Sequence, residues 1–291
     1  MSDYRGRFAP SPTGDLHFGS LVAAVGSWLR ARAKGGVWLV RIEDLDPPRE
    51  VAGAAERILA TLQAFGMAPD EAVVAQSRRH VHYAAALDQL IKRGLAFPCC
   101  CSRKQLEASG GLHRAPCARP ASGASCAWRA RVPDLDVAFD DAVVGRYAQS
   151  LRQDVGDFVL KRIDGLYAYQ LAVVVDDAAQ AISEVVRGAD LLDSTPRQIW
   201  LQRALDLPTP AYLHLPLVLD EHGHKLGKSH ASMPVDATDP LPALRAALRF
   251  LGQPEHPDCH SVAALLRCAA TSFDVAKIPA SIPSRIAGRS D

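Results

Sequence analysis

Two short segments, about 200 residues apart, carry side chains suited to phosphate chemistry. The first is APSPTGDLHFGS, where His17 and Gly19 follow a turn rich in proline and glycine. The second is HKLGKS, which places Lys225 and Lys228 three residues apart in a loop that contains glycine. Imidazole and ammonium groups can neutralise charge on a reacting phosphate and on a departing pyrophosphate. Each segment alone is also typical of an ordinary turn or a solvated basic loop, so their combination is what predicts a nucleotide site.

A third group of residues has the spacing of metal ligands. Cys99, Cys101, His113 and Cys117 form a Cys-x-Cys…His-x3-Cys pattern. Four such ligands leave no open position, which is typical of a structural tetrahedral Zn²⁺ site, with one ion per chain. Cys126 is an alternative fourth ligand, and buried reduced thiols are the alternative to metal binding. The odd total of seven cysteines favours metal ligation over a disulfide framework.

Alternating strands and helices are expected to position these groups. The patterns predict strands at 5–9 and 35–44 and helices at 20–33, 49–66, 78–92 and 195–205. Strand, helix, strand and helix in succession favour parallel units with right-handed crossovers, which gives an α/β doubly wound parallel sheet. Such sheets bind ligands at the carboxyl ends of their strands, where His17 stands. The helix that follows would aim free N–H groups at a phosphate.

The pattern breaks at Phe97, where a stretch rich in cysteine, glycine and proline begins. We therefore expect four parts: a first half of the catalytic domain (1–96), an inserted zinc-binding module (97–133), a second half (134–206), and a basic loop with a helical subdomain (207–291).

Composition limits the possible functions only loosely. The formal net charge is +1, so a nucleic-acid site must be a local patch. No apolar run reaches the roughly 18–20 residues that cross a bilayer, and the segment MSDYRGRFAP lacks the apolar centre of a signal peptide. A cytoplasmic enzyme is the expectation.

Taken together, the two phosphate segments resemble the HIGH and KMSKS motifs of class I aminoacyl-tRNA synthetases. His17-Phe18-Gly19-Ser20 stands for HIGH, with Ser20 in place of the second histidine. Lys225-Leu226-Gly227-Lys228-Ser229 stands for KMSKS, with leucine and glycine in place of methionine and serine. RIEDLD, YAYQLAVVVDD and VVRGADLLDSTPRQ are similar, in this order, to the glutamyl/glutaminyl branch. The resemblance covers roughly residues 5–229 and implies a Rossmann-like class I synthetase catalytic domain with a zinc-binding insertion and a helical C-terminal subdomain.

The resemblance implies roles for individual residues. Those implied to bind glutamate are Arg7, Ser11, Glu43 (on the α-ammonium), Tyr169 and Arg187. Those implied to bind ATP, together with its Mg²⁺ ion, are His17, Gly19, Lys225 and Lys228. Of these, the implied catalytic residues are His17, Gly19 and Lys228. In the zinc site, relatives carry tyrosine where this chain has His113. Arg41 or Arg187 could instead only pair with Glu43 or Asp44, and Tyr169 could belong to the core.

Only about 60 residues follow Ser229, so we expect no anticodon-binding domain. This feature resembles truncated members of the glutamyl branch, which esterify glutamate onto the queuosine of tRNA(Asp) at the wobble position. The implied partners are ATP, L-glutamate and tRNA(Asp) carrying queuosine, with no membrane, and we expect a monomer. Three alternatives stay open: a glutamate–tRNA ligase acting on the 3′ end, an adenylate-forming amino-acid ligase unrelated to tRNA, and a non-catalytic synthetase-like RNA-binding protein.

Overall fold

The computed structural model describes residues 2–107, 111–114, 125–218 and 233–280. The strands are β1 (Arg5–Phe8), β2 (Val37–Ile42), β3 (Val74–Ala75), β4 (Ala96–Cys99), β5 (Ala127–Ala130), β6 (Asp136–Asp141), β7 (Gly145–Ser150), β8 (Val159–Lys161), β9 (Glu184–Gly188) and β10 (Ala211–Leu215). The α-helices are α1 (Phe18–Ala33), α2 (Ala54–Ala64), α3 (His80–Lys92), α4 (Arg103–Glu107), α5 (Tyr169–Ala179), α6 (Thr195–Ala204), α7 (Pro240–Phe250) and α8 (Val262–Ser272). In these residues no helix combines the length and apolar character that crossing a membrane requires.

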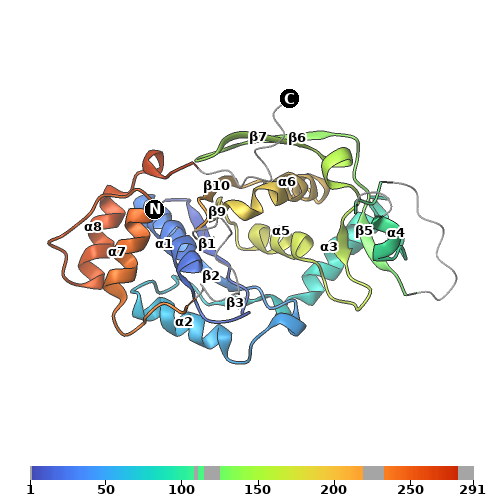
Figure 1. Ribbon diagram of the computed structural model, residues 1–291. Helices are drawn as coiled ribbons and strands as arrows, with labels where there is room; N and C mark the ends of the chain where they lie inside the picture. Colours follow the sequence, from blue (N-terminus) through green and yellow to red (C-terminus); the bar gives the residue numbers. More distant parts are fainter. Residues whose placement is uncertain (1, 108–110, 115–124, 219–232, 281–291) are drawn as a thin grey trace.

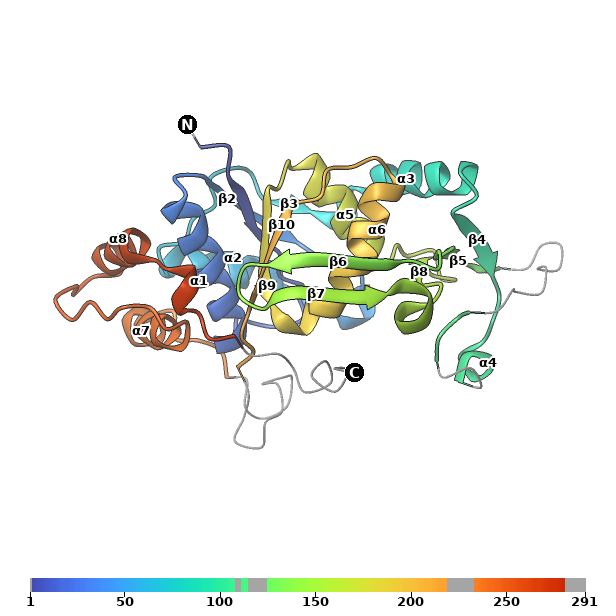
Figure 2. The same cartoon turned by 90° about the horizontal axis from the view of Figure 1, so that it is seen from above.

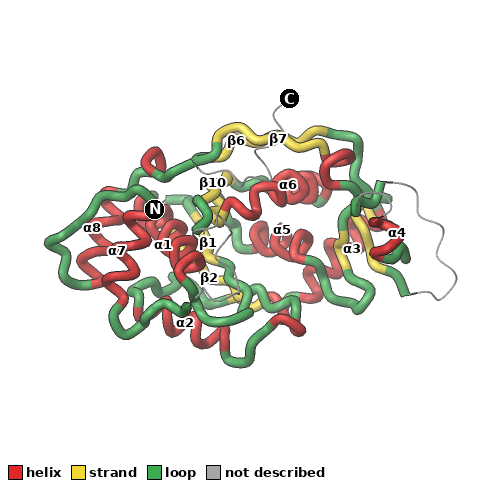
Figure 3. The backbone as a smooth tube through the Cα atoms, viewed as in Figure 1, coloured by secondary structure: helices red, strands yellow, loops and turns green. Residues whose placement is uncertain are grey.

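Parallel strands run through the middle of the molecule, between helices (Figures 1 and 3). β2 pairs in parallel with β1 and β3, and β10 pairs in parallel with β9 and β6. The two groups of strands meet where Ser183 N donates to Arg5 O over 2.9 Å. The chain runs β1–α1–β2 in one group and β9–α6–β10 in the other. This is the doubly wound α/β architecture, so the predicted fold class is confirmed.

The two faces of the sheet bury two separate apolar cores. On β2, Trp38 and Val40 enter the core that includes residues of α1, α2, α7 and α8, whereas Leu39 enters the core that includes residues of α3, α5 and α6. Successive side chains of a strand point to opposite faces. Arg41 therefore lies on the same face as Leu39, as does Arg7, which is the register partner of Leu39 on β1. Alternation thus directs both arginines toward α5.

A second, smaller sheet lies at one end of the molecule, beside α4 (Figure 2). Here β5 pairs in antiparallel fashion with both β4 and β8. The strand β8 comes after residue 133, so the sheet joins the cysteine-rich segment to a later part of the chain. The boundaries of the four expected parts remain predictions.

Two elements differ from the expected pattern. The β6–β7 hairpin has no counterpart among the expected elements; it pairs from Asp136↔Ser150 to Asp141↔Gly145 and continues the sheet beyond β10. The helix expected at 49–66 is shorter, because α2 begins only at Ala54, after Gly53 with φ +72°. Consecutive prolines upstream form a turn of 3-10 helix, Pro47–Arg49, and cannot donate the backbone hydrogen bonds that an α-helix needs.

Helices α7 and α8 pack against α1, at the opposite end from β4 and α4 (Figure 1). Leu244 of α7 and Leu265 of α8 are fully buried in the core they share with α1. Phe250, at the end of α7, meets Phe18 edge to face, with ring centroids 6.3 Å apart. The expected helical tail therefore supports the first turn of α1, directly after His17.

Candidate active site

A cavity of about 1550 Å³ opens at the carboxyl ends of β1, β2, β9 and β10. Doubly wound sheets bind their ligands at this edge, and the volume exceeds the roughly 300–1000 Å³ of a typical pocket for one small molecule. Seven of the residues predicted to bind glutamate or ATP line it: Arg7, Ser11, His17, Gly19, Glu43, Tyr169 and Arg187. The fold therefore gathers into one place all the predicted glutamate-binding residues and two of the predicted ATP-binding residues.

The two predicted ATP-binding lysines, Lys225 and Lys228, lie outside the described residues. The described residues on either side of their segment do border the cavity, Val218 before it and Pro234 after it. Pro234 also forms a β-bridge with His17. The described chain after the lysine segment therefore lies beside His17, and the described chain before it borders the same cavity.

His17 is the N-cap residue of α1, with an extended backbone at φ −101° and ψ 170°. Its Nδ1 accepts a hydrogen bond from Ser20 N (3.3 Å), and its Nε2 lies 3.0 Å from Ser20 Oγ. Because Nδ1 accepts, a neutral ring carries its hydrogen on Nε2 and donates it to the hydroxyl. A Cβ at Gly19 would lie 3.3 Å from His17 Cε1, so glycine leaves the ring its space. Ser20, where HIGH has a second histidine, thus orients the first.

Arg7 and Glu43 belong to a buried network of ion pairs. Asp177 of α5 pairs with Arg7 (Nε to Oδ1, 3.0 Å) and with Arg41 (Nη2 to Oδ1, 2.8 Å). Arg41, fully buried, also donates to Glu43 Oε1 over 3.2 Å, the pairing considered above as a structural alternative. Burial raises the pKa of Glu43 against the opposing effect of Arg41. Burial acts in the same direction on Asp177, but the two arginines outweigh it and lower the pKa of that carboxyl.

Part of this network is open to a ligand. Arg7 uses Nε and Nη2 for Asp177, and Glu43 uses Oε1 for Arg41. Within the described part of the chain, no hydrogen-bond partner takes Arg7 Nη1 or Glu43 Oε2. One cationic donor and one anionic acceptor are therefore available in the cavity that both residues line.

Tyr169 and Arg187 form a second hydrogen-bonded pair in the site. Tyr169 is the first residue of α5, and its hydroxyl accepts a hydrogen bond from Arg187 Nη1 (3.3 Å). Burial raises the pKa of Tyr169, so the hydroxyl keeps its proton at neutral pH. Arg187 lies on β9, on the face that also holds Arg7, and is buried except at the cavity.

Cys99, Cys101 and His113 form a group that could hold a metal ion. Their ligand atoms all lie within 4.8 Å of one another, which suits bonds of about 2.3 Å from sulfur and 2.0–2.1 Å from nitrogen to one Zn²⁺. His113 Nδ1 lies 2.9 Å from Asp157 Oδ2, so Nε2 is the ring nitrogen that would bind a metal. Metal-binding histidines commonly have such a carboxylate partner. The predicted fourth ligand, Cys117, lies outside the described residues.

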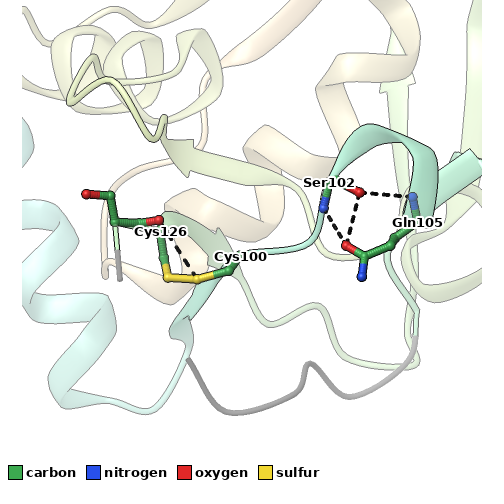
Figure 4. The surroundings of a disulfide bond; sticks show 5 residues. Cys100, Ser102, Gln105 and Cys126 are labelled. Carbon is green, nitrogen blue, oxygen red and sulfur yellow. Dashed lines mark hydrogen bonds between the residues drawn. A yellow bond between two sulfur atoms is a disulfide. The ribbon is translucent and has the colours of Figure 1, made fainter. Parts of the chain in front are cut away.

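The alternative ligand Cys126 is bonded to Cys100 in a disulfide (Figure 4). The expectation of metal ligation in place of disulfide bonding is therefore corrected for this pair, and so is Cys126 as a substitute ligand. The reason is the pairing of β4 with β5, in which Cys99 and Ala127 are register partners, so the residues next to them in the chain lie opposite each other. Of His113 and Cys126, the two candidates to complete the set of ligands, His113 is the one that lies with Cys99 and Cys101.

Three buried residues were not among the predicted set, namely Asp141, Asp177 and His214. Asp177 and His214 lie in mostly apolar elements, the helix segment YQLAVVVDD and the strand AYLHL, whereas Asp141 ends the strand DVAFDD. A charge or an imidazole inside an apolar element needs a buried polar partner, and this is the signal the sequence does contain. The identity of the partner depends on packing between segments far apart in the chain.

The site and the fold together define a class I synthetase catalytic domain. Residues 3–120 and 111–256 match the family "tRNA synthetases class I (E and Q), catalytic domain", and the chain belongs to this family. Its relatives include proteins named glutamyl-Q tRNA(Asp) synthetase. The one from Xanthomonas campestris pv. campestris (strain 8004) is 58% identical over 279 residues, which cover 95% of this chain and 93% of the relative. The one from Ectopseudomonas mendocina (strain ymp) is 53% identical over 281 residues, 96% of each. The resemblance inferred from the motifs is confirmed.

A solved structure supports the same fold. The glutamate tRNA ligase from Elizabethkingia meningosepticum CCUG26117, solved in complex with its amino acid, has a TM-score of 0.80 and 26% identity to this chain. The alignment covers 97% of this chain and 66% of that ligase, so the chain spans about two thirds of the ligase's length.

Proposed function

We propose that this chain activates L-glutamate with ATP and transfers the glutamyl group to the queuosine at the wobble position of tRNA(Asp). The observation that carries the proposal is the convergence of Arg7, Glu43, Tyr169 and Arg187 with His17 on one cavity. The high identity to proteins named glutamyl-Q tRNA(Asp) synthetase, over nearly their whole length, supports the choice of acceptor.

In the proposed glutamate site, each charged group of glutamate faces a protein group of opposite charge. Glu43 Oε2 receives the α-ammonium group, and Ser11, in the loop after β1, also lines the cavity. The α-carboxylate must reach the ATP phosphate beside His17, so the side-chain carboxylate is left for Arg187 and Tyr169. A guanidinium suits a carboxylate because it can donate two parallel hydrogen bonds.

In the first step, an oxygen of the glutamate α-carboxylate attacks the α-phosphorus of Mg²⁺-bound ATP. A new P–O bond forms, the bond to the β-phosphate oxygen breaks, and pyrophosphate leaves. His17 and the N-terminal end of α1 stabilise the charge on the α-phosphate. Lys225 and Lys228 act on the departing pyrophosphate in this proposal, because the described ends of their segment border the same cavity.

In the second step, a hydroxyl of the queuosine cyclopentene ring attacks the carbonyl of the adenylate. An ester bond forms and AMP leaves with the bonding electrons. No residue of the described site is assigned as a dedicated base, and the departing phosphate can take the hydroxyl proton. The protein's part is to align the carbonyl between Arg187 and His17.

We also propose that the metal group binds one structural Zn²⁺ through Cys99, Cys101, His113 and Cys117. A bound zinc would supply no chemistry to the reaction; it would tie β4 to the segment around His113. Asp157 holds the imidazole by its Nδ1. Because Cys99 and Cys101 also border the large cavity, this module would form part of the wall that meets the tRNA.

Pyrophosphate exchange into ATP tests the first step. We expect exchange that depends on glutamate and not on glutamine or aspartate. Nuclease digestion of tRNA labelled with glutamate tests the second step, and we expect the label in the anticodon fragment. Label on the 3′ adenosine would support the 3′-charging alternative, exchange without any tRNA product would support a tRNA-independent ligase, and no exchange would support a non-catalytic binding protein. The monomeric state and the cytoplasmic location remain predictions.

A further inference from the structure

The side chain of Arg187 is held from behind by three buried acceptors. Its Nε donates to His214 Nε2 (3.1 Å), its Nη1 to Gln198 Oε1 (2.8 Å) and its Nη2 to Thr195 Oγ1 (2.7 Å). All three partners are at most 2% exposed. The backbones of Arg187 and His214 are register partners in the parallel pair β9–β10, so this contact is built into the sheet.

The other two N–H groups of the guanidinium face the cavity. Nη1 donates to Tyr169 Oη and Nη2 to Leu191 O, both over 3.3 Å, and both of these partners line the cavity. These two contacts are longer than those to Gln198 and Thr195. All five N–H groups are therefore engaged, and a substrate carboxylate would replace the two longer contacts, accepting one hydrogen bond from each terminal nitrogen in the end-on bidentate arrangement.

The direction of the contact between His214 and Arg187 is set by Asp141, at the end of β6. Asp141 Oδ1 accepts from the backbone N–H groups of Val143, Val144 and His214, at 3.0, 2.9 and 3.2 Å. Its other oxygen, Oδ2, lies 2.6 Å from His214 Nδ1. A carboxylate only accepts, so Nδ1 carries the imidazole hydrogen and Nε2 is left as an acceptor facing Arg187.

We propose that Asp141 and His214 are positioning residues that fix Arg187 for the side-chain carboxylate of the amino-acid substrate. This inference rests on the proposed function. The pair anchors the arginine by Nε, so only the two terminal nitrogens remain for the substrate. It also makes the β6–β7 hairpin, which the sequence pattern did not predict, part of the machinery for amino-acid selection.

The substitution Asp141→Asn reverses the direction of the hydrogen bond to His214 Nδ1 with almost no change in side-chain shape. The three backbone N–H groups keep the amide oxygen at the Oδ1 position, so the amide nitrogen takes the Oδ2 position and donates to His214 Nδ1. The imidazole hydrogen then moves to Nε2 and opposes the N–H of Arg187. Asp140→Asn is the matched control, because Asp140 is the preceding residue on β6 and its side chain is 78% exposed.

We expect D141N to raise the glutamate KM in pyrophosphate exchange at least tenfold, with the ATP KM and the kcat within about threefold of wild type. The control D140N should match wild type in all three. The preference for glutamate over glutamine, as a ratio of kcat/KM values, should fall with D141N, a change that loss of stability alone would not produce. A wild-type glutamate KM in folded D141N would overturn the inference.

If D141N fails to fold, a second pair of variants tests whether His214 positions Arg187. Gln at position 214 offers an amide oxygen to Arg187, whereas Met has a similar length and no such acceptor. We expect His214→Gln to have a glutamate KM at least fivefold lower than His214→Met, and equal values would overturn the inference. Absence of exchange in the wild-type chain would instead overturn the proposed function, and this inference with it.

Discussion

Asp177 Oδ1 accepts hydrogen bonds from Arg7 Nε, at 3.0 Å, and this ion pair is buried on both sides. The same oxygen lies 2.8 Å from Arg41 Nη2, so one carboxylate aligns the arginines of the first two strands. Because Nε and Nη2 of Arg7 are both engaged, the side chain can turn only Nη1 toward the cavity. A residue on α5 therefore determines how the first strand presents its charge to a ligand.

Replacing Asp177 by Asn should weaken both folding and glutamate binding. Removal of one partner from a buried ion pair costs about 3–5 kcal/mol, because a charge is left without compensation. We expect a loss of stability of this size in urea unfolding and a glutamate KM raised about tenfold or more. Unchanged stability would show that the network is not maintained in solution, and the exposed variant Asp140→Asn is the control.

Substitutions at the start of α1 separate the roles of His17 and Ser20. His17→Ala should lower the kcat of pyrophosphate exchange by about 10²–10³, the usual cost of a group that stabilises developing charge. Ser20→Ala removes one hydrogen bond to the ring but keeps the backbone N–H that donates to Nδ1. A decrease of about three- to tenfold in kcat, with an unchanged glutamate KM, is expected. Equal effects of both substitutions would contradict the role assigned to Ser20.

Metal binding should depend on Asp157 as well as on the ligands. Asp157→Asn removes the charged partner of His113 and should lower zinc affinity about 10–100-fold. Elemental analysis after dialysis against a chelator measures this, with Cys259→Ser as a control outside the group. Zinc retained equally by both variants would contradict the assignment of His113 as a ligand.

Acidification should lower the folding stability of the protein, because His214 must stay neutral in the folded state. Burial lowers the pKa of His214 below its usual value of 6.5, and the opposing effect of Asp141 does not restore it. The charged and titratable groups around it are Asp141, Arg187, Asp190 and the stacked Tyr212. Below about pH 6.5, His214 therefore binds a proton in the unfolded chain but stays neutral in the folded chain. The free energy of unfolding falls as the pH drops through about 6.5, by at most about 1.4 kcal/mol per pH unit.

Urea unfolding at pH 7.0 and 5.5 measures this dependence, with His214→Gln as the comparison. We expect the wild-type protein to lose more stability than the variant over this interval, together with a rise in glutamate KM. Parallel losses in the two proteins would mean that His214 does not account for the acid sensitivity.

Much of the site was accessible from the sequence because its residues follow strands directly. Glu43 follows the buried strand β2, and His17 follows the turn after β1, so local pattern and motif together placed them. The group that could hold a metal ion was predictable in part for a similar reason, since the spacing of Cys99 and Cys101 is local.

The supporting residues were not accessible in the same way. Asp177 is separated from Arg7 by 170 positions, and His214 from Asp141 by 73, so their pairing is decided by how α5 and the β6–β7 hairpin pack. The Cys100–Cys126 disulfide likewise depends on the register of β4 with β5. Hydrophobic periodicity specifies which face of an element is buried, but it does not specify which partner covers a buried charge.

In the proposed reaction the glutamyl group is transferred to queuosine. The most direct measurement compares glutamate incorporation into two preparations of tRNA(Asp), one carrying queuosine and one with unmodified guanosine at the wobble position. We predict ATP-dependent incorporation into the first preparation, located in the anticodon loop, and none into the second. Equal incorporation into both preparations, or label at the 3′ adenosine, would contradict the account.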